Sequence, residues 1–160
     1  DADNRVLRLR DNYLSLRGYR LPTEVEFEYA SRAGAATRRC YGEADELLVK
    51  FAWYVPNALG QPHPVAQLLP NDYGIFDPLG NLWNWCLDRP RKFASTPVDI
   101  VEDIEDENLQ IDNTARALHG GCYTDHAFWL RSAYRYKDNP SSTPSLVGFR
   151  LARTISPRQP

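Results

Sequence analysis

The prolines between residues 53 and 74 place the strongest constraint on the fold of this chain. Pro56, Pro62, Pro64 and Pro70 lie among asparagines and glycines in this stretch, and proline cannot donate a hydrogen bond to a sheet ladder. We therefore expect an irregular loop that aromatic side chains hold in place. The whole chain has 12 Pro and 9 Gly, with 4 Trp, 9 Tyr and 6 Phe. This composition is typical of a loop-rich fold whose core is filled by large rings.

One strong helix signal precedes that loop. Thr23 is followed three residues later by Glu26, the spacing of a capping box that satisfies the free amides of a helix start. The sequence predicts a helix over about residues 24–33, with Gly34 placed to end it. A second, shorter helix is predicted over 43–51. The apolar stripe of the first helix consists of Val25, Phe27, Tyr29, Ala30 and Ala33.

The remainder of the chain predicts short strands and polar loops. Alternating or apolar runs predict strands over 82–87, 129–136 and 147–152. The acidic run over 99–107 lacks the glycine and the spacing of a calcium loop, so we interpret it as a solvated loop rather than a calcium or basic-partner site. No internal repeat or linker interrupts the 160 residues, which indicates one domain.

The overall charge and the cysteines narrow the class of protein. Nineteen basic residues balance twenty-one acidic ones, so we expect no nucleic-acid partner. No apolar run is long enough for a membrane span, and residues 1–10 are not a signal peptide. The compartment stays unknown, because a signal upstream of this sequence would not be visible. Of the possible compartments, the cytoplasm is favoured. Cys40, Cys86 and Cys122 indicate reduced, packed thiols, with one disulfide plus a free thiol as the alternative.

Four regions of the sequence together form a family signature. The first is Tyr19–Ala30, with the letters YRLPTEVEFEYA, and the second is Pro70–Cys86, which contains GNLWNW. The third is Arg116–Cys122, which contains HGGC, and the fourth combines Arg131–Arg135 with the GFR segment Gly148–Arg153. In order and spacing they resemble the sulfatase-modifying-factor family, which includes the formylglycine-generating enzymes.

The resemblance implies an α+β fold of the C-type-lectin-like kind, with short antiparallel strands and one or two helices. It assigns residues 19–154 to the domain, 1–18 to an N-terminal arm or remnant, and 155–160 to a tail. Family domains have a further N-terminal portion before the first motif, and only about eighteen residues precede it here. We therefore expect that this portion is trimmed or that another chain supplies it, which would leave a sheet edge in need of a partner.

The resemblance also shows that the family's catalytic groups are missing. The enzymes hold copper with two cysteine thiolates, soft ligands that suit Cu(I), a few residues after the Gly-Gly motif. Asp125 lies near the first of these positions, no cysteine lies near the second, and Cys122 replaces the serine of the motif. We therefore predict no catalytic residues and favour a protein that is not an enzyme. A divergent oxidase of the formylglycine-generating or sulfoxide-synthase type is the alternative.

Two metal hypotheses follow from the sequence. His119, Cys122 and His126 have a spacing that is compatible with a metal site or a nucleophile pair, although an incidental packed thiol is the favoured interpretation. The resemblance suggests a structural calcium ion near the second motif, as the only cofactor. Its ligands would be Asp77, the carbonyls of Gly80 and Leu82, and Asn84, where a neutral amide replaces the family's glutamate and weakens the site.

The favoured function is a non-catalytic module of a larger bacterial protein that binds a protein or a small ligand. The loops after the Gly-Gly motif and before the GFR motif are expected to form one exposed face, mixing aromatic and polar side chains as binding surfaces do. A diversified receptor domain of the same fold is a further alternative. Trp129 and Tyr134 are expected to be buried. The predicted binding face consists of Tyr123, Thr124, Asp125, His126, Phe128, Tyr136, Lys137, Asp138 and Asn139.

Overall fold

The computed structural model describes residues 7–8, 12–90, 110–111, 113–142 and 145–155. It contains one α-helix, one 3-10 helix and short strands within these ranges, which confirms the α+β expectation. The acidic run over 99–107 lies outside the described residues. Among the described helices, none is both long and apolar enough to span a bilayer.

The helix α1, Glu24–Arg32, forms as its capping box predicts. The Thr23 side chain accepts a hydrogen bond from the Glu26 amide at 3.1 Å, and the Glu26 carboxylate accepts one from the Thr23 amide at 2.9 Å. The helix ends at Ala33, in the left-handed region at φ 49°, one residue before the predicted Gly34. The second predicted helix is a 3-10 helix over Asp45–Lys50.

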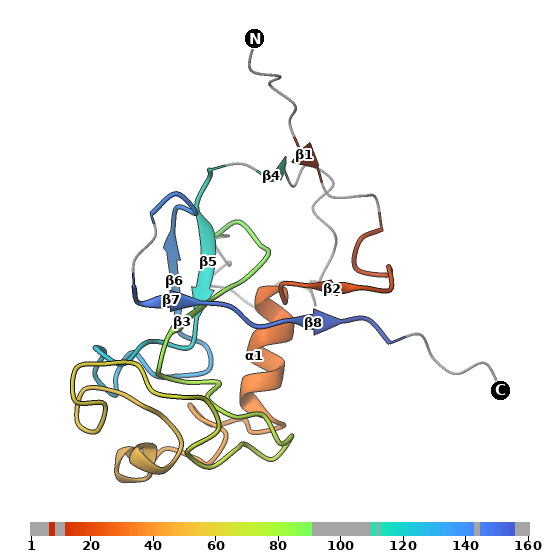
Figure 1. Cartoon of the computed structure of the whole chain (residues 1–160). Helices are drawn as coiled ribbons and strands as arrows, with labels where there is room; N and C mark the ends of the chain where they lie inside the picture. The colour runs from red at the N-terminus through yellow and green to blue at the C-terminus, as the bar shows by residue number, and fades with distance from the viewer. Residues whose placement is uncertain (1–6, 9–11, 91–109, 112, 143–144, 156–160) are drawn as a thin grey trace, which may run out of the picture.

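A four-stranded sheet stands beside α1, in the order β6-β5-β3-β7 (Figure 1). Its strands are β3 (Trp83–Trp85), β5 (Arg116–His119), β6 (Arg135–Asp138) and β7 (Val147–Gly148). Strands β3, β5 and β6 pair antiparallel, whereas β3 and β7 pair parallel, which departs from the expected all-antiparallel arrangement.

The two faces of this sheet bury different sets of side chains, because successive side chains of a strand point to opposite faces. On one face, Ala117 packs with Phe27 of α1 and with Cys86. On the other face, Leu118 packs with Trp83 and Cys122. The second face, away from α1, includes Cys122 from the loop after β5.

Two smaller ladders complete the described strands. Strand β2 (Tyr19–Arg20) pairs antiparallel with β8 (Ala152–Arg153), which joins the first motif to the last one. Strand β1 (Leu7–Arg8) pairs with β4 (Gln110–Ile111). Residues 7–8 thus pair with residues 110–111, which precede β5 in the sequence.

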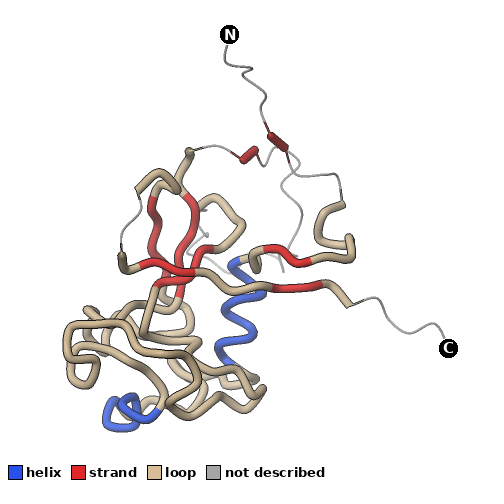
Figure 2. Tube along the Cα trace, in the orientation of Figure 1, coloured by secondary structure: helices blue, strands red, loops and turns tan. Residues whose placement is uncertain are grey.

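Residues 34–80 run mainly as loop, as the prolines predict (Figure 2). Their core consists of Leu48, Ala52, Tyr54 and Leu79, packed with Leu130. Each predicted strand is shorter than expected. The prediction over 129–136 is wrong in its first half, because residues 127–133 form turns and β6 begins only at Arg135.

Candidate functional site

The loop after β5 begins with a turn that only glycine accommodates. Gly120 has a φ of 96°, and a Cβ atom there would lie 2.9 Å from the Pro78 carbonyl oxygen. The Gly120 carbonyl accepts a hydrogen bond from the Gly80 amide at 2.8 Å, and the Tyr123 amide donates to the Asn81 carbonyl at 2.9 Å. The Gly-Gly loop and the loop before β3 are therefore fixed against each other.

Asp125 builds the next turn of this loop. Its Oδ2 atom accepts a hydrogen bond from the Cys122 amide at 2.8 Å, and its own amide donates to the Cys122 carbonyl at 3.1 Å. Its carbonyl accepts from the Val55 amide at 3.1 Å. At the position near the family's first copper-binding cysteine, this chain thus has a carboxylate that holds the backbone.

The Cys122 thiol is poorly suited to act as a nucleophile. It is buried, and its sulfur lies 3.1 Å from the Thr124 hydroxyl. Burial raises the pKa of Cys122, although the contact with Thr124 opposes this. A buried thiol with a raised pKa stays protonated and reacts slowly. All three cysteines of the chain are free thiols.

The three side chains of the His-Cys-His spacing do not converge. His119 is buried, with Nε2 3.1 Å from the Glu24 Oε1 atom. Cys122 packs on the opposite face of the sheet with Trp83, and His126 is exposed. Within the described ranges, no group of three His, Cys, Asp or Glu side chains is placed to hold a metal ion.

A buried arginine fixes the base of the loop that follows. Arg39 is 1% exposed, and its guanidinium donates to the Leu130 carbonyl at 2.8 Å and to the Ala127 carbonyl at 2.9 Å. Its Nη1 atom also pairs with Asp45 at 2.7 Å. Residues 127–130 are therefore held by a side chain that is about ninety positions away in the sequence.

Next to residues 127–130, aromatic rings from the loop and from the sheet contact one another in a continuous series. Phe128 meets Trp129 edge-on with centroids 4.9 Å apart, and Trp129 meets Tyr134 at 4.7 Å. Trp83 of β3 contacts Tyr134 at 5.9 Å and Tyr136 at 5.6 Å. Phe128, Tyr136 and Trp129 are 60%, 55% and 38% exposed, whereas Trp83 is buried. We call the five rings of Phe128, Trp129, Tyr134, Tyr136 and Trp83 the aromatic surface.

Arg131 adds a positive charge to the aromatic surface. Its guanidinium carbon lies 4.3 Å from the centroid of the Phe128 ring and 5.6 Å from that of Tyr134. Both distances are within the range of a cation–π contact. The surface therefore combines exposed apolar area with one fixed cation.

The structure places the predicted face in two parts. Tyr123 and Asp125 are half-buried in the Gly-Gly loop, where Thr124 and His126 are exposed. At the opposite end of β5, Arg116 pairs with Asp138, so Asp138 and Asn139 lie away from that loop.

Strand alternation further divides the predicted face. It directs Lys137 to the side of the sheet opposite Tyr136. Phe128 and Tyr136 are therefore the predicted residues that contribute rings to the aromatic surface. The expectation that Trp129 is buried is wrong: its ring lies over Tyr134 at the rim of the surface, and Tyr134 is half-buried.

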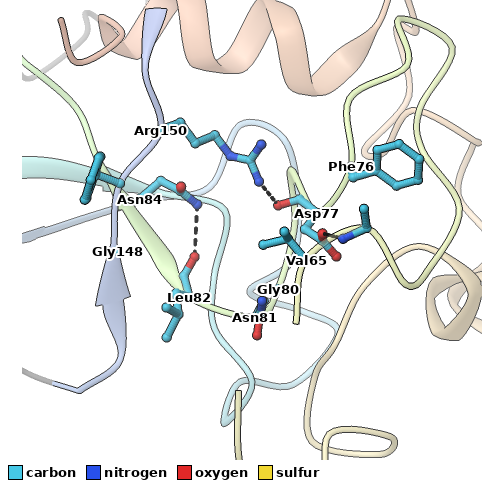
Figure 3. A pocket seen from close by; sticks show the side chains of 11 residues that line it. Val65, Phe76, Asp77, Gly80, Asn81, Leu82, Asn84, Gly148 and Arg150 are labelled. Carbon is cyan, nitrogen blue, oxygen red and sulfur yellow. Dashed lines mark hydrogen bonds between the residues drawn. The ribbon is translucent and has the colours of Figure 1, made fainter. Parts of the chain in front are cut away.

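The four candidate calcium ligands line one cavity of about 390 Å³ (Figure 3). Asp77 is buried, and its Oδ2 atom accepts from the Ala66 amide at 2.7 Å. Its Oδ1 atom has no hydrogen-bond partner among the described residues. The side-chain Nδ2 atom of Asn84 donates to the Leu82 carbonyl at 2.9 Å. The cavity is thus lined by a buried carboxylate, one oxygen of which has no partner among the described residues, and by neutral polar groups.

A guanidinium enters the same cavity from the GFR segment. Arg150 donates to the Asp77 carbonyl oxygen, as Figure 3 shows. Burial lowers the pKa of Arg150, and the charge of Asp77 opposes that shift. The oxygens therefore fit a hard cation in their chemistry, whereas the guanidinium and the neutral Asn84 both limit its affinity.

Arg39 and Arg131 are the site residues that sequence reasoning missed. Arg131 belongs to the fourth motif, but nothing in the local sequence shows that its guanidinium would lie over Phe128. Arg39 lies six positions before the acidic Asp45 in the sequence. This spacing is compatible with an ion pair, but it does not indicate that the arginine is buried.

Comparisons with known proteins identify a family that the chain matches over nearly its whole length. Residues 5–155 match the sulfatase-modifying factor enzyme 1-like domain. The formylglycine-generating enzyme of Streptomyces coelicolor is 35% identical over 158 residues, which cover 88% of this chain and 48% of that protein. The serine/threonine-protein kinase pkn1 of Chlamydia pneumoniae is 31% identical over 90% of this chain and 22% of its own length.

A solved structure is similar over a comparable share of the chain. Treponema denticola variable protein 1 superposes with a TM-score of 0.74 at 29% identity, covering 86% of this chain and 48% of that one. The chain thus spans about half the length of that structure and of the Streptomyces enzyme.

Proposed function

The chain belongs to the family of sulfatase-modifying factor enzyme 1-like domains, which have a C-type-lectin-like fold, and we propose that it is a non-catalytic module that binds a peptide segment of a partner protein. The aromatic surface is the proposed binding site. The partner would place apolar side chains on Phe128 and Tyr136 and an acidic or carbonyl oxygen near Arg131.

The exposure of the rings is the observation that carries this proposal. Phe128 and Tyr136 are both more than half exposed, yet each contacts another ring of the surface. Aromatic and arginine side chains dominate binding energy at protein interfaces because they bury a large area at a small entropic cost. A large apolar patch left open to water is a mark of such a site.

The way in which the surface is supported favours binding without rearrangement. Arg39 holds residues 127–130 from below, and Asp125 holds the turn that precedes them. Trp83 lies beneath Tyr134 and Tyr136. A surface whose side chains are already fixed loses less entropy when a partner binds, which increases affinity.

Selection from a random peptide library displayed on phage tests this function, with calorimetry on the enriched peptides. We expect Phe128→Ala and Tyr136→Ala each to weaken binding by about tenfold, as hot-spot residues do. Tyr29→Ala is the matched control, because Tyr29 is 66% exposed but lies on α1 at the other face of the sheet. Selection of no peptide, or equal binding by all variants, would contradict the proposal.

The oxidase alternative is supported by the 35% identity to a formylglycine-generating enzyme. Against it, Asp125 holds a turn, and the single nearby thiol, Cys122, is buried. Oxygen consumption with Cu(I) and a cysteine-containing peptide separates the two functions. Stoichiometric copper binding with turnover would replace the binding proposal, and we expect neither.

A further inference from the structure

A second cavity, of about 280 Å³, adjoins the aromatic surface and is lined by three arginines. Arg32 comes from the last turn of α1, Arg38 from the loop that follows α1, and Arg131 from the turn before β6. Tyr134 completes the wall that the cavity shares with the aromatic surface. Three segments that are distant in sequence therefore bring guanidinium groups to one place.

Two of these arginines pair with glutamates that lie outside the cavity. The Arg32 Nε atom donates to Glu28 at 2.8 Å, and the Arg38 Nε atom pairs with Glu43 at 2.7 Å. The side chains of Arg38 and Glu43 are 60% and 52% exposed, so water screens this pair and it contributes little. Neither glutamate lines the cavity.

Arg131 is the arginine whose charge is not compensated. No carboxylate pairs with Arg131 in the part of the chain that the structure describes; its contacts there are the rings of Phe128 and Tyr134. Its Nε atom is buried and has no hydrogen-bond acceptor among the same residues. The nearby carboxylate of Asp125 accepts from the Cys122 amide instead. A partly desolvated guanidinium with unused donors binds an anion more strongly than a hydrated one does.

We infer that this cavity, the arginine pocket, binds an oxyanion group of a ligand, either a carboxylate or a tetrahedral phosphate or sulfate. Arg131 supplies the principal contact, and Arg38 can turn from Glu43 to supply a second. A guanidinium presents parallel N–H donors that match two oxygens of such a group. Because Arg131 also lies on Phe128, one ligand can place its oxyanion in the arginine pocket and an apolar group on the aromatic surface.

Titration with sodium sulfate, sodium phosphate and sodium acetate tests the inference, at an ionic strength held constant with sodium chloride. The readout is the Nε–Hε resonance of each arginine in the NMR spectrum of the whole chain. We expect a saturable shift at Arg131, with a dissociation constant raised roughly tenfold in Arg131→Gln and about threefold in Arg38→Gln. Arg153→Gln is the control, since Arg153 lies over Tyr19 outside the pocket.

The three anions also distinguish the source of the oxyanion. Tighter binding of acetate would support a carboxylate ligand, and tighter binding of sulfate or phosphate a tetrahedral one. A response without saturation, or one equal in wild type and both pocket variants, would overturn the inference. If circular dichroism shows that Arg131→Gln does not fold, the inference is judged from the dissociation constant of Arg38→Gln alone. Saturable anion binding without any selected peptide would leave the arginine pocket standing and remove the proposed peptide function.

Discussion

Glu24, which is buried, and Arg135, which is half-buried, form an ion pair that joins the start of α1 to β6, across 111 positions of sequence. The Arg135 Nε atom donates to Glu24 Oε1 at 2.8 Å, and a second guanidinium nitrogen contacts Oε2. His119 of β5 contacts the same carboxylate at 3.1 Å. Glu24 is only 5% exposed, so its charge is stabilised by these partners and by its position in the first turn of the helix. The pair fixes α1 on the sheet face opposite the aromatic surface.

We expect Glu24→Gln to destabilise the fold by about 2 kcal/mol at pH 7, because it removes the carboxylate charge that pairs with the partly buried Arg135 guanidinium. Burial raises the pKa of Glu24, but hydrogen bonds from His119 and Arg135 more than offset this, and the pKa lies below the ordinary value of 4.5. The unfolded chain therefore takes up the proton first as the pH falls below 4.5, and the stabilisation by Glu24 is lost as the pH drops through the folded pKa.

Urea unfolding between pH 7 and pH 3 measures this effect as the difference in unfolding free energy between wild type and Glu24→Gln. The difference should shrink as the pH falls below the ordinary carboxyl pKa, and a constant difference would contradict the prediction. Some acid dependence remains in the variant, because the pKa of Glu26 is also lowered, against the effect of burial, by its contact with Arg20. Glu28→Gln is the control: its pair with Arg32 at the surface should contribute less than about 0.5 kcal/mol.

Arg39→Met should destabilise the chain by about 3 kcal/mol, since it removes the side-chain donor to the carbonyl of the buried Leu130 and one of the two donors to the Ala127 carbonyl. Asp45→Asn, which removes only the exposed partner of Arg39, should have an effect below about 1 kcal/mol. Hydrogen exchange supplies the specific readout. The Leu130 amide, which donates to Ala127 at 3.2 Å, should exchange faster in Arg39→Met than in Asp45→Asn. Equal exchange in both variants would show that Arg39 does not hold this loop.

The parts of the fold that local chemistry determines were predictable from the sequence. Thr23 and Glu26 specify the start of α1 because a capping box needs only residues three apart. The loop over residues 53–74 follows from proline geometry. The first half of the strand predicted over 129–136 is wrong for the opposite reason: its apolar residues lie in a turn that Arg39, from another part of the chain, stabilises. A local pattern cannot report a partner that is about ninety residues away.

The sequence indicated which loop the candidate site would include, but not all of the residues that form it. The Gly-Gly motif identified the loop, and Phe128 and Tyr136 were both named from the sequence. Trp129 was misjudged because a tryptophan in a presumed strand is expected to face the core. In a turn that ends beside Tyr134, its ring lies at the rim instead. Arg131 acquires its role from Phe128 and Tyr134 together, a relationship that exists only after folding.

Two rings of the aromatic surface should differ in their contribution to stability: Trp83 should stabilise the fold, whereas Phe128 should serve mainly in binding. Trp83→Ala removes a ring that is buried with Leu118 and Cys122 and should cost about 3–5 kcal/mol of unfolding free energy. Phe128→Ala removes a ring that is 60% exposed, so its effect on stability should stay within about 1 kcal/mol. Thermal unfolding of both variants measures this contrast. Equal destabilisation by the two substitutions would mean that Phe128 supports the fold and is not free to bind.

Calcium should bind in the cavity of Asp77 weakly, and Asn84→Glu should strengthen it. The Asp77 Oδ1 atom has no partner among the described residues, and a half-turn of the Asn84 amide would present its oxygen beside the carbonyls of Gly80 and Leu82. A glutamate at position 84 would add a second negative charge, and calcium affinity rises with the charge of the ligands. It would also offset the guanidinium of Arg150, which now contacts the Asp77 carbonyl.

The thermal unfolding midpoint, measured with and without millimolar calcium chloride, tests this prediction. An ion that binds only the folded state stabilises it by about 2.7 kcal/mol when its concentration is one hundred times the dissociation constant. Asn84→Glu should therefore gain more from calcium than wild type does, while Asp77→Asn should gain nothing. Magnesium at the same concentration controls for ionic strength, because it needs a tighter octahedral geometry than these oxygens supply. Equal shifts with both ions, or a shift that persists in Asp77→Asn, would place any bound calcium outside this cavity.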